Sequence, residues 1–99
     1  MVSSIEGHQL LSRSPHVLST EAGGEVALMN IPNGRYYALD AVGSAIWRKL
    51  EQPVAMGQLA TALNAEYNGD PVRIETDLRE TLEEWRAWRL ISVTPLTGR

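Results

Sequence analysis

Hydrophobic and polar side chains follow the two-residue rhythm of β-strands over much of the first part of the chain. Short apolar runs of this kind predict three strands, at residues 16–20, 25–31 and 35–39. The segments between them, Gly23-Gly24 and Pro32-Asn33-Gly34, favour tight turns because Gly and Asn adopt positive φ at little cost. Two tight turns between three strands predict an antiparallel meander.

The rhythm changes at Asp40 to the 3.6-residue period of a helix. Asp is a good N-cap, because its carboxylate accepts hydrogen bonds from the unpaired amides of the first turn. Val42, Ile46 and Leu50 then recur every four residues and predict a buried stripe. We expect this first helix to end at Gln52-Pro53.

Two more helices are predicted after it. The first covers about residues 56–67 and is closed by Asn68-Gly69. Asp70-Pro71 then supplies an N-cap and a proline at the first helical position, where the missing N–H costs nothing. This third helix runs to about residue 90, and its predicted buried stripe consists of Ile74, Leu78, Leu82 and Trp85, with Thr81 beside them.

Three strands followed by three helices predict an α+β fold, with the helices gathered against one side of a three-stranded antiparallel sheet. The helical part has the order of a winged-helix-like domain. We expect a flexible N-terminal arm over residues 1–14, with at most a short extended piece at 9–11. The folded domain is expected over 15–94, with a short extended piece at 91–93, and a C-terminal tail over 95–99.

Composition narrows the class of protein. The 99 residues are 43% apolar and 21% charged, which is typical of one soluble globular domain. No cysteine is present, so disulfides and thiolate metal sites are excluded. The N-terminus lacks the pattern of a signal peptide, and no apolar run is long enough to span a bilayer. We therefore expect a cytoplasmic protein without a membrane partner.

Nothing in the sequence indicates catalysis. The only two histidines, His8 and His16, do not have the spacing of a metal pair. No serine lies in a G-x-S-x-G elbow, and Ser44 between Gly43 and Ala45 is typical of small-residue packing. No glycine-rich phosphate loop is present. We expect no active site, no cofactor and no metal.

The charge pattern disfavours nucleic acid as a partner. The formal net charge is −3, and residues 71–90 carry five acids against four arginines. A helix that reads DNA must approach phosphates, and its affinity rises with the number of Lys and Arg contacts. A winged-helix DNA-binding regulator therefore remains only as an alternative.

Peptide recognition is the better hypothesis. The strand at 35–39 is the last of the meander, so one of its edges is free unless another segment covers it. An open edge presents N–H and C=O groups onto which an extended peptide can add. A groove would form if the third helix lay beside this edge.

Two motifs carry a resemblance to a known family. One is GRYYALDAVGSAIWRKL at residues 34–50, and the other is D-P-x-x-I-x-x-D-L-x-x-x-L-x-x-W at residues 70–85. Together with the leucine-bearing helix between them, they resemble the PqqD-like family over residues 17–93. Its members are RiPP recognition elements, small domains that bind the leader of ribosomally synthesised precursor peptides.

The resemblance implies a fold of three strands and three helices, no enzymatic activity, and delivery of the leader-bound precursor to a modifying enzyme such as a leader peptidase or cyclase. It also implies that the leader pairs with the strand at 35–39 and packs against the third helix. By strand alternation, Tyr37 and Leu39 should face the helices. The implied peptide-binding residues are Arg35, Tyr36, Tyr37, Ala38, Leu39, Ile74, Asp77, Leu78, Thr81, Leu82 and Trp85.

The resemblance leaves the pathway and the assembly open. The Gly-Arg-Tyr-Tyr-Ala-Leu-Asp run is most similar to the stand-alone recognition half of a split lasso-peptide maturation protein. A peptide chaperone of pyrroloquinoline quinone biosynthesis is the alternative. Many members end the third helix with a Leu-x-x-x-Gly-Leu stop, whereas this chain has no glycine between Trp85 and Ile91. The end of this helix, and whether the protein forms a homodimer, are therefore not implied by the family.

Overall fold

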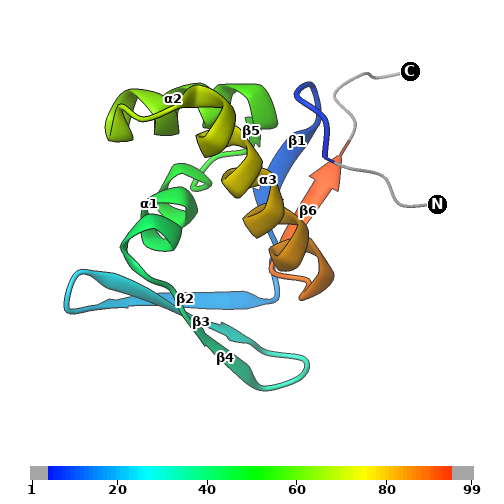
Figure 1. Ribbon diagram of the computed structural model, residues 1–99. Coiled ribbons are helices and arrows are strands. Elements are labelled where there is room, and N and C mark those ends of the chain that lie inside the picture. The colour runs from blue at the N-terminus through cyan, green and yellow to red at the C-terminus, as the bar shows by residue number, and fades with distance from the viewer. Residues whose placement is uncertain (1–4, 95–99) are drawn as a thin grey trace.

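The computed structural model describes residues 5–94, which form two small sheets and three helices (Figure 1). The terminal residues of the predicted arm and the predicted tail, 1–4 and 95–99, lie outside the described part. The elements in chain order are β1 (Leu10–Arg13), β2 (Val17–Ala22), β3 (Glu25–Asn30), β4 (Arg35–Ala38), α1 (Ala41–Lys49), β5 (Val54–Ala55), α2 (Met56–Tyr67), α3 (Pro71–Ala87) and β6 (Ile91–Thr94).

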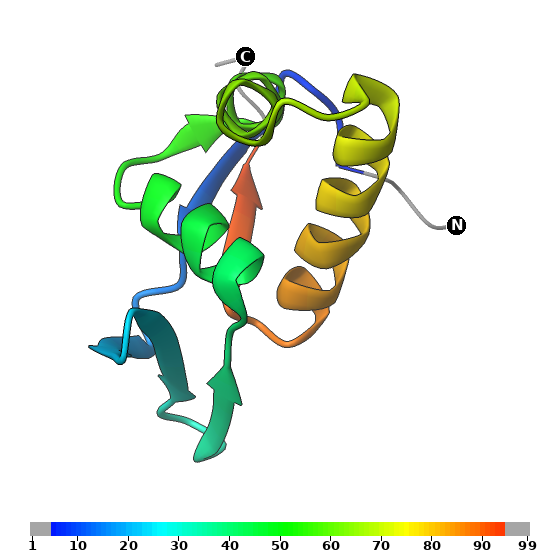
Figure 2. The same ribbon diagram turned by 60° about the vertical axis from the view of Figure 1, so that its left-hand side comes forward.

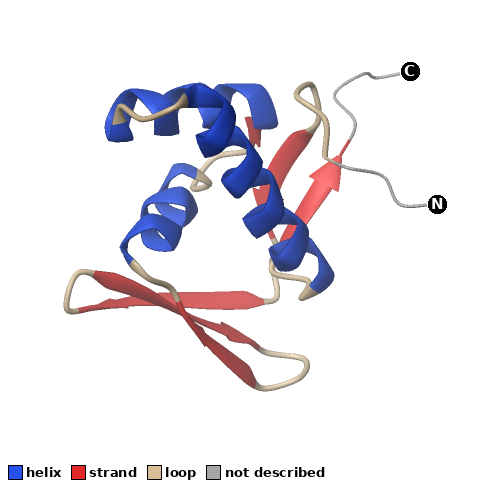
Figure 3. Cartoon of the chain, in the orientation of Figure 1, coloured by secondary structure: helices blue, strands red, loops and turns tan. Residues whose placement is uncertain are grey.

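The predicted meander is the sheet β2-β3-β4, which is antiparallel throughout. Its strands differ from the predicted ranges by one or two residues. Gly34, at φ +70°, lies in the turn between β3 and β4, and its N–H donates to the carbonyl of Asn30 at 2.8 Å. All three helices lie on one side of this sheet (Figure 3). The α+β fold predicted from the sequence is confirmed.

A second sheet, β5-β1-β6, was not predicted. Its central strand is β1, which pairs with β6 from Leu10 opposite Thr94 to Arg13 opposite Ile91. The expectation of a loose arm is therefore wrong for the described residues 5–14. The predicted extended piece at 91–93 does form a strand, and β1 is the partner that holds it.

The start of the described chain is ordered because it closes the hydrophobic core. The side chains of Ile5 and Leu11 are completely buried. The N–H of Ile5 donates to the carboxylate of Glu83 on α3 at 2.9 Å, and the N–H of Gly57 donates to the carbonyl of Gly7 at 3.0 Å. These contacts join distant parts of the chain, so a local pattern could not reveal them.

The predicted helix starts are confirmed. The Asp40 carboxylate accepts from the N–H of Gly43 at 2.7 Å, and the Asp70 carboxylate accepts from the N–H of Val72 at 3.0 Å. Helix α2 ends at Tyr67, and its C-cap residue Asn68 has the left-handed φ of 55° expected at the predicted stop. The starts of α1 and α3 therefore each depend on a carboxylate only two or three residues from the amide that it caps.

Helix α3 ends earlier than predicted, at Ala87. Arg89 adopts φ +62°, the conformation that usually requires glycine. The N–H of Leu90 then donates to the carbonyl of Trp85 at 2.8 Å, and the N–H of Arg89 donates to that of Arg86 at 3.0 Å. This is a Schellman stop without glycine. Complete burial of Leu90 stabilises it by placing an apolar side chain directly after the left-handed residue.

Candidate functional site

The outer edge of β4 is unpaired within the described part of the chain. Strand β4 pairs with β3 alone, in a register that places Tyr37 opposite Leu28. The N–H of Leu39 donates to the carbonyl of Val26 at 2.9 Å. Because antiparallel strands alternate the direction of their N–H groups, Tyr37 also faces β3. The N–H and C=O groups of Tyr36 and Ala38 therefore point to the open edge.

The two faces of β4 have different surroundings. The strand register places Tyr37 opposite the buried Leu28, so both side chains lie on the face of the sheet that the helices cover. Leu39 is itself buried. Tyr36 lies on the opposite face and is 76% exposed. The prediction that Tyr37 and Leu39 face the helices is confirmed.

An aromatic pair joins β4 to the end of α3. The rings of Tyr37 and Trp88 stack with their centroids 5.0 Å apart and their planes inclined by 20°. Trp88 is the C-cap residue of α3 and remains 40% exposed. The pair therefore fixes the position of α3 relative to β4 while leaving aromatic surface open to solvent.

A groove runs from the end of β4 along α3, with α1 as its other wall. We call it the α1–α3 groove. It consists of two hollows that share Val42, Ile46 and Thr81. The hollow near β4 is also lined by Ala38, Leu39, Asp40, Gly43, Glu84, Trp85 and Trp88. The hollow near α2 is also lined by Leu63, Tyr67, Ile74, Asp77 and Leu78.

The structure brings most of the predicted site residues together. Those that line the α1–α3 groove are Ala38, Leu39, Ile74, Asp77, Leu78, Thr81 and Trp85. Tyr37 joins them through its stack on Trp88. Arg35 and Tyr36 are exposed on β4 and line neither hollow.

Leu82 does not belong to this surface. It is completely buried and supports the groove from below. The family resemblance implied a binding role for Leu82, whereas its place on the apolar stripe of α3 predicted the burial that the structure shows. Ile74, predicted as part of the same buried stripe, lies at its edge and is only half buried.

Sequence reasoning missed several residues of the groove. Val42 was predicted to be buried, yet it is 45% exposed and lines both hollows. The other missed residues are Asp40, Gly43, Ile46, Leu63, Tyr67, Glu84 and Trp88. The three-residue spacing of Trp85 and Trp88 was the one available signal, because it places both rings on the same side of a helix.

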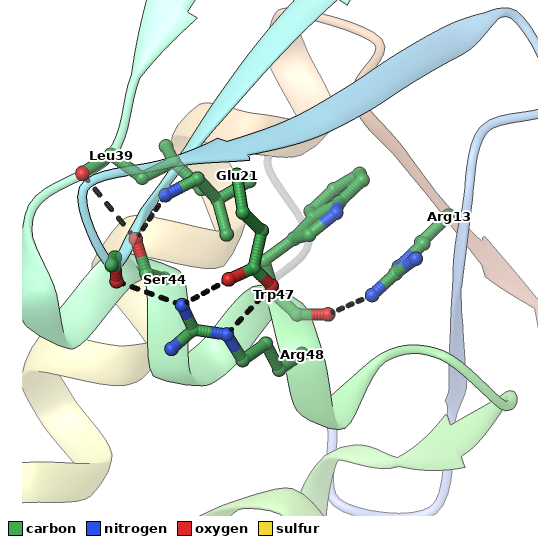
Figure 4. A network of polar contacts seen from close by, with 8 residues as sticks. Arg13, Glu21, Leu39, Ser44, Trp47 and Arg48 are labelled. Atoms are coloured by element: carbon green, nitrogen blue, oxygen red, sulfur yellow. Dashed lines mark hydrogen bonds and ion pairs between the residues drawn. The ribbon is translucent and has the colours of Figure 1, made fainter.

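Polar contacts attach α1 to the strands behind the groove (Figure 4). The Arg48 guanidinium donates to both carboxylate oxygens of Glu21, at 3.0 and 2.9 Å, and to the carbonyl of Gly24 at 2.8 Å. The Arg13 guanidinium donates to the carbonyl of Trp47 at 2.7 Å and lies over its ring. These contacts hold the β2–β3 hairpin and β1 against α1, so they fix one wall of the groove.

The ion pair behind α1 shifts the titration of both partners. The hydrogen bond from Arg48 lowers the pKa of Glu21 below its ordinary value, and the same bond raises the pKa of Arg48. Burial lowers the pKa of Arg13, although Glu51 opposes that shift.

The remaining chemistry of the described residues is sparse. Over residues 5–94, no three His, Asp or Glu side chains are grouped as they would be to hold a metal ion. None of the helices described is both long and apolar enough to cross a membrane.

Comparison with known proteins agrees with the geometry. The model of the family described as coenzyme PQQ synthesis protein D (PqqD) matches residues 25–91. The chain belongs to the PqqD family. The match begins at β3 and ends at the first residue of β6, so it includes β4, all three helices and the whole α1–α3 groove.

One solved structure is similar to the PqqD-family chain over most of its length. It is TbiB1 in complex with the TbiA(beta) leader peptide, with a TM-score of 0.77 and 36% sequence identity. The similarity covers 82% of this chain and 94% of that chain. No curated protein matches the chain. The resemblance drawn from the sequence motifs is confirmed.

Proposed function

We propose that this protein binds the leader segment of a ribosomally synthesised precursor peptide. The leader adds as an extended strand to the open edge of β4, and its inward side chains enter the α1–α3 groove. The protein itself is not an enzyme and presents the bound precursor to one.

One observation carries the proposal: the open edge of β4 lies at the mouth of the α1–α3 groove, which has apolar side chains along its length. Ala38 contributes both its outward-pointing backbone and part of the groove lining. An added strand obtains main-chain hydrogen bonds from the edge and side-chain pockets from the groove, which is the usual division of affinity and specificity in strand addition. The similar structure of TbiB1 with a leader peptide supports this use of the fold.

The residues have distinct roles in this proposal. Tyr36 and Ala38 hydrogen-bond the leader through their backbones, and Arg35 borders the start of the paired segment. The leader's inward side chains lie on the same face of the sheet as Tyr37 and Leu39, the face that the helices cover. The α3 side chains that contact the leader are Ile74, Asp77, Leu78, Thr81 and Trp85. Leu82 supports them from the core.

The partner enzyme is a modifying enzyme such as a leader peptidase or cyclase. The Gly-Arg-Tyr-Tyr-Ala-Leu-Asp run supports a role in lasso-peptide maturation. A peptide chaperone of pyrroloquinoline quinone biosynthesis is the second candidate, and the description of the matching family favours it. Both roles place the protein in the cytoplasm, and either is compatible with a homodimer.

The excess of acids on α3 counts against the DNA-binding alternative. Helix α3 and the three residues after it contain five acids and four arginines. Phosphate recognition requires an excess of Lys and Arg over acidic residues. This helix is therefore unsuited to enter the major groove of DNA.

Capture from cells tests the proposal. The tagged protein and its Ala38→Pro variant, shown by circular dichroism to be folded, are used to retain ligands from an extract of the source cells, and the eluates are analysed by mass spectrometry. We expect the wild type to retain a precursor peptide through its leader and the variant to lose it. Equal capture by both proteins, or retention of DNA alone, would contradict the proposal.

A second measurement tests the absence of catalysis. The captured precursor is incubated with the purified protein, and its mass is followed over time. We expect no change until a modifying enzyme is added. A mass change with the purified protein alone would show that it is an enzyme.

A further inference from the structure

The charged side chains that line the α1–α3 groove all have the same sign. They are Asp40, Asp77 and Glu84, and neither hollow is lined by a Lys or an Arg. The cation on β4, Arg35, is at the opposite end of the strand from Ala38. An occupant of the groove therefore meets an apolar floor with carboxylates beside it.

Two of these carboxylates have no partner within the described part of the chain. Asp40 is engaged as the N-cap of α1. No hydrogen bond or ion pair links the side chain of Asp77 or Glu84 to another described residue. Both come from α3, so the arginines of this helix are the nearest candidates for pairing with them.

Arg73, four residues before Asp77, makes no ion pair with it in the described part of the chain, and the other two arginines of α3 pair elsewhere. Arg79 binds the carboxylate of Glu75 at 2.7 Å, and Arg86 lies 3.8 Å from that of Glu83. The helix thus pairs Glu75 and Glu83, which line neither hollow, and leaves the two groove acids unpaired. A positively charged leader segment can supply the cationic partners that α3 does not provide for these two acids.

The spacing of the two acids fits an extended peptide. Asp77 and Glu84 are two helical turns apart, which corresponds to about 10 Å along the axis of α3. An extended chain covers this distance in about three residues. The apolar Leu78 and Trp85 line the groove over the same stretch. Two basic side chains roughly two to four residues apart can reach both carboxylates, while apolar neighbours occupy the floor.

We infer that the groove selects a cationic, amphipathic leader segment, in which Lys or Arg side chains bind Asp77 and Glu84 beside apolar anchors. The inference rests on the proposed function and adds the chemical class of its ligand. The net charge of −3 acts in the same direction, because it attracts a basic peptide at long range.

Selection from a random peptide library tests the inference. Displayed random peptides are selected at low salt on the wild type, on the double variant Asp77→Asn/Glu84→Gln, and on the folded Ala38→Pro variant. Glu80→Gln is the control for loss of a carboxylate from α3, because it removes one negative charge at a residue that lines neither hollow of the groove. We expect the wild type and Glu80→Gln to enrich peptides with Lys or Arg next to apolar residues. The double variant should enrich apolar peptides without this bias.

Affinities of one enriched peptide make the test quantitative. We expect the double variant to bind it about three- to tenfold more weakly than the wild type does, the loss typical of two exposed ion pairs. Glu80→Gln should bind it as the wild type does. Replacing the basic residues of the peptide with Gln should abolish the difference between wild type and double variant, because the coupling is then absent.

The outcomes separate this inference from the proposed function. Enriched peptides that need the β4 edge but show no basic bias, or a bias that persists in the double variant, would overturn the inference and leave leader binding intact. A wild type that enriches no peptide, or an Ala38→Pro variant that enriches the same ones, would overturn both.

Discussion

The hydroxyl of Ser44 accepts a hydrogen bond from the backbone N–H of Val26 at 2.8 Å and reaches the carbonyl of Leu39 at 3.4 Å. Ser44 is completely buried in α1, and Val26 begins the part of β3 that packs on the helix. One side chain thus joins α1 to β3 and to the residue that follows β4. The small-residue packing expected at this position includes a specific polar contact.

Ser44→Ala should therefore destabilise the fold. The substitution leaves a buried N–H without an acceptor, which costs about 1–3 kcal/mol. Urea unfolding measures the loss. Thr61→Ala is the control, because its exposed hydroxyl only bonds back to the carbonyl of Gly57 in the same helix, and it should change the stability by less than about 0.5 kcal/mol. Equal unfolding midpoints for Ser44→Ala and wild type would show that water accepts the hydrogen bond from the N–H of Val26 in the variant.

Asp70→Ala should remove the N-cap of α3. Loss of this cap costs about 1 kcal/mol, whereas Asp70→Asn should retain most of the stability because Asn also caps well. Thermal unfolding of the three proteins checks the order. Leader affinity should change less than stability, since Asp70 does not line the α1–α3 groove. An Asp70→Ala protein as stable as the wild type would show that this hydrogen bond does not stabilise the helix.

Proline substitutions should distinguish the two sides of β4. Tyr36→Pro and Ala38→Pro remove N–H groups that point to the open edge, so the domain should fold and lose its peptide ligand. Tyr37→Pro removes an N–H that faces Leu28 in β3, so it should unfold or strongly destabilise the domain. Circular dichroism and fluorescence anisotropy of a labelled leader peptide measure the two effects. Folded Tyr36→Pro and Ala38→Pro variants with wild-type affinity would rule out strand addition at this edge.

The two tryptophans of α3 should behave differently. Trp85 is buried and packs edge-on against Trp47, with ring centroids 5.8 Å apart, so Trp85→Ala should cost about 3–5 kcal/mol. Trp88→Ala removes the stack on Tyr37 and should cost only about 1 kcal/mol. The Trp88 variant should remain folded but bind the leader roughly three- to tenfold more weakly. Trp88→Phe keeps a ring against Tyr37 and should recover part of the affinity.

The carboxylate of Glu21, in the ion pair behind α1, should become protonated at a lower pH than the carboxylate of an isolated glutamate. Arg48 lowers the pKa of Glu21 in the folded state, so this contribution is present above the ordinary pKa of Glu. It is lost as the pH falls through the lowered value. An NMR titration of the Glu21 carboxyl carbon should show the lowered pKa, and Arg48→Gln should return it to the ordinary range. Identical titrations in both proteins would mean that the pair does not form in solution.

The sequence by itself determined the local features of this protein. The strands of the meander, the caps at Asp40 and Asp70, and the stop at Asn68 follow from interactions between residues a few positions apart. Strand alternation likewise places Tyr37 and Leu39 on one face. Such features can be read from a single chain because the hydrogen bonds and periodicities that produce them are short-range.

Only the tertiary structure decided which segments meet. The sequence predicted a loose arm where β1 forms. The strand is stabilised by pairing with β6 at the far end of the chain, which no local pattern indicates (Figure 2). The apolar stripe of α1 predicted that Val42 is buried, but Val42 borders the α1–α3 groove and is 45% exposed. The stack of Tyr37 on Trp88 and the two uncompensated acids on α3 likewise depend on how the elements pack. Packing reflects burial summed over the whole core, and no window of a few residues contains that sum.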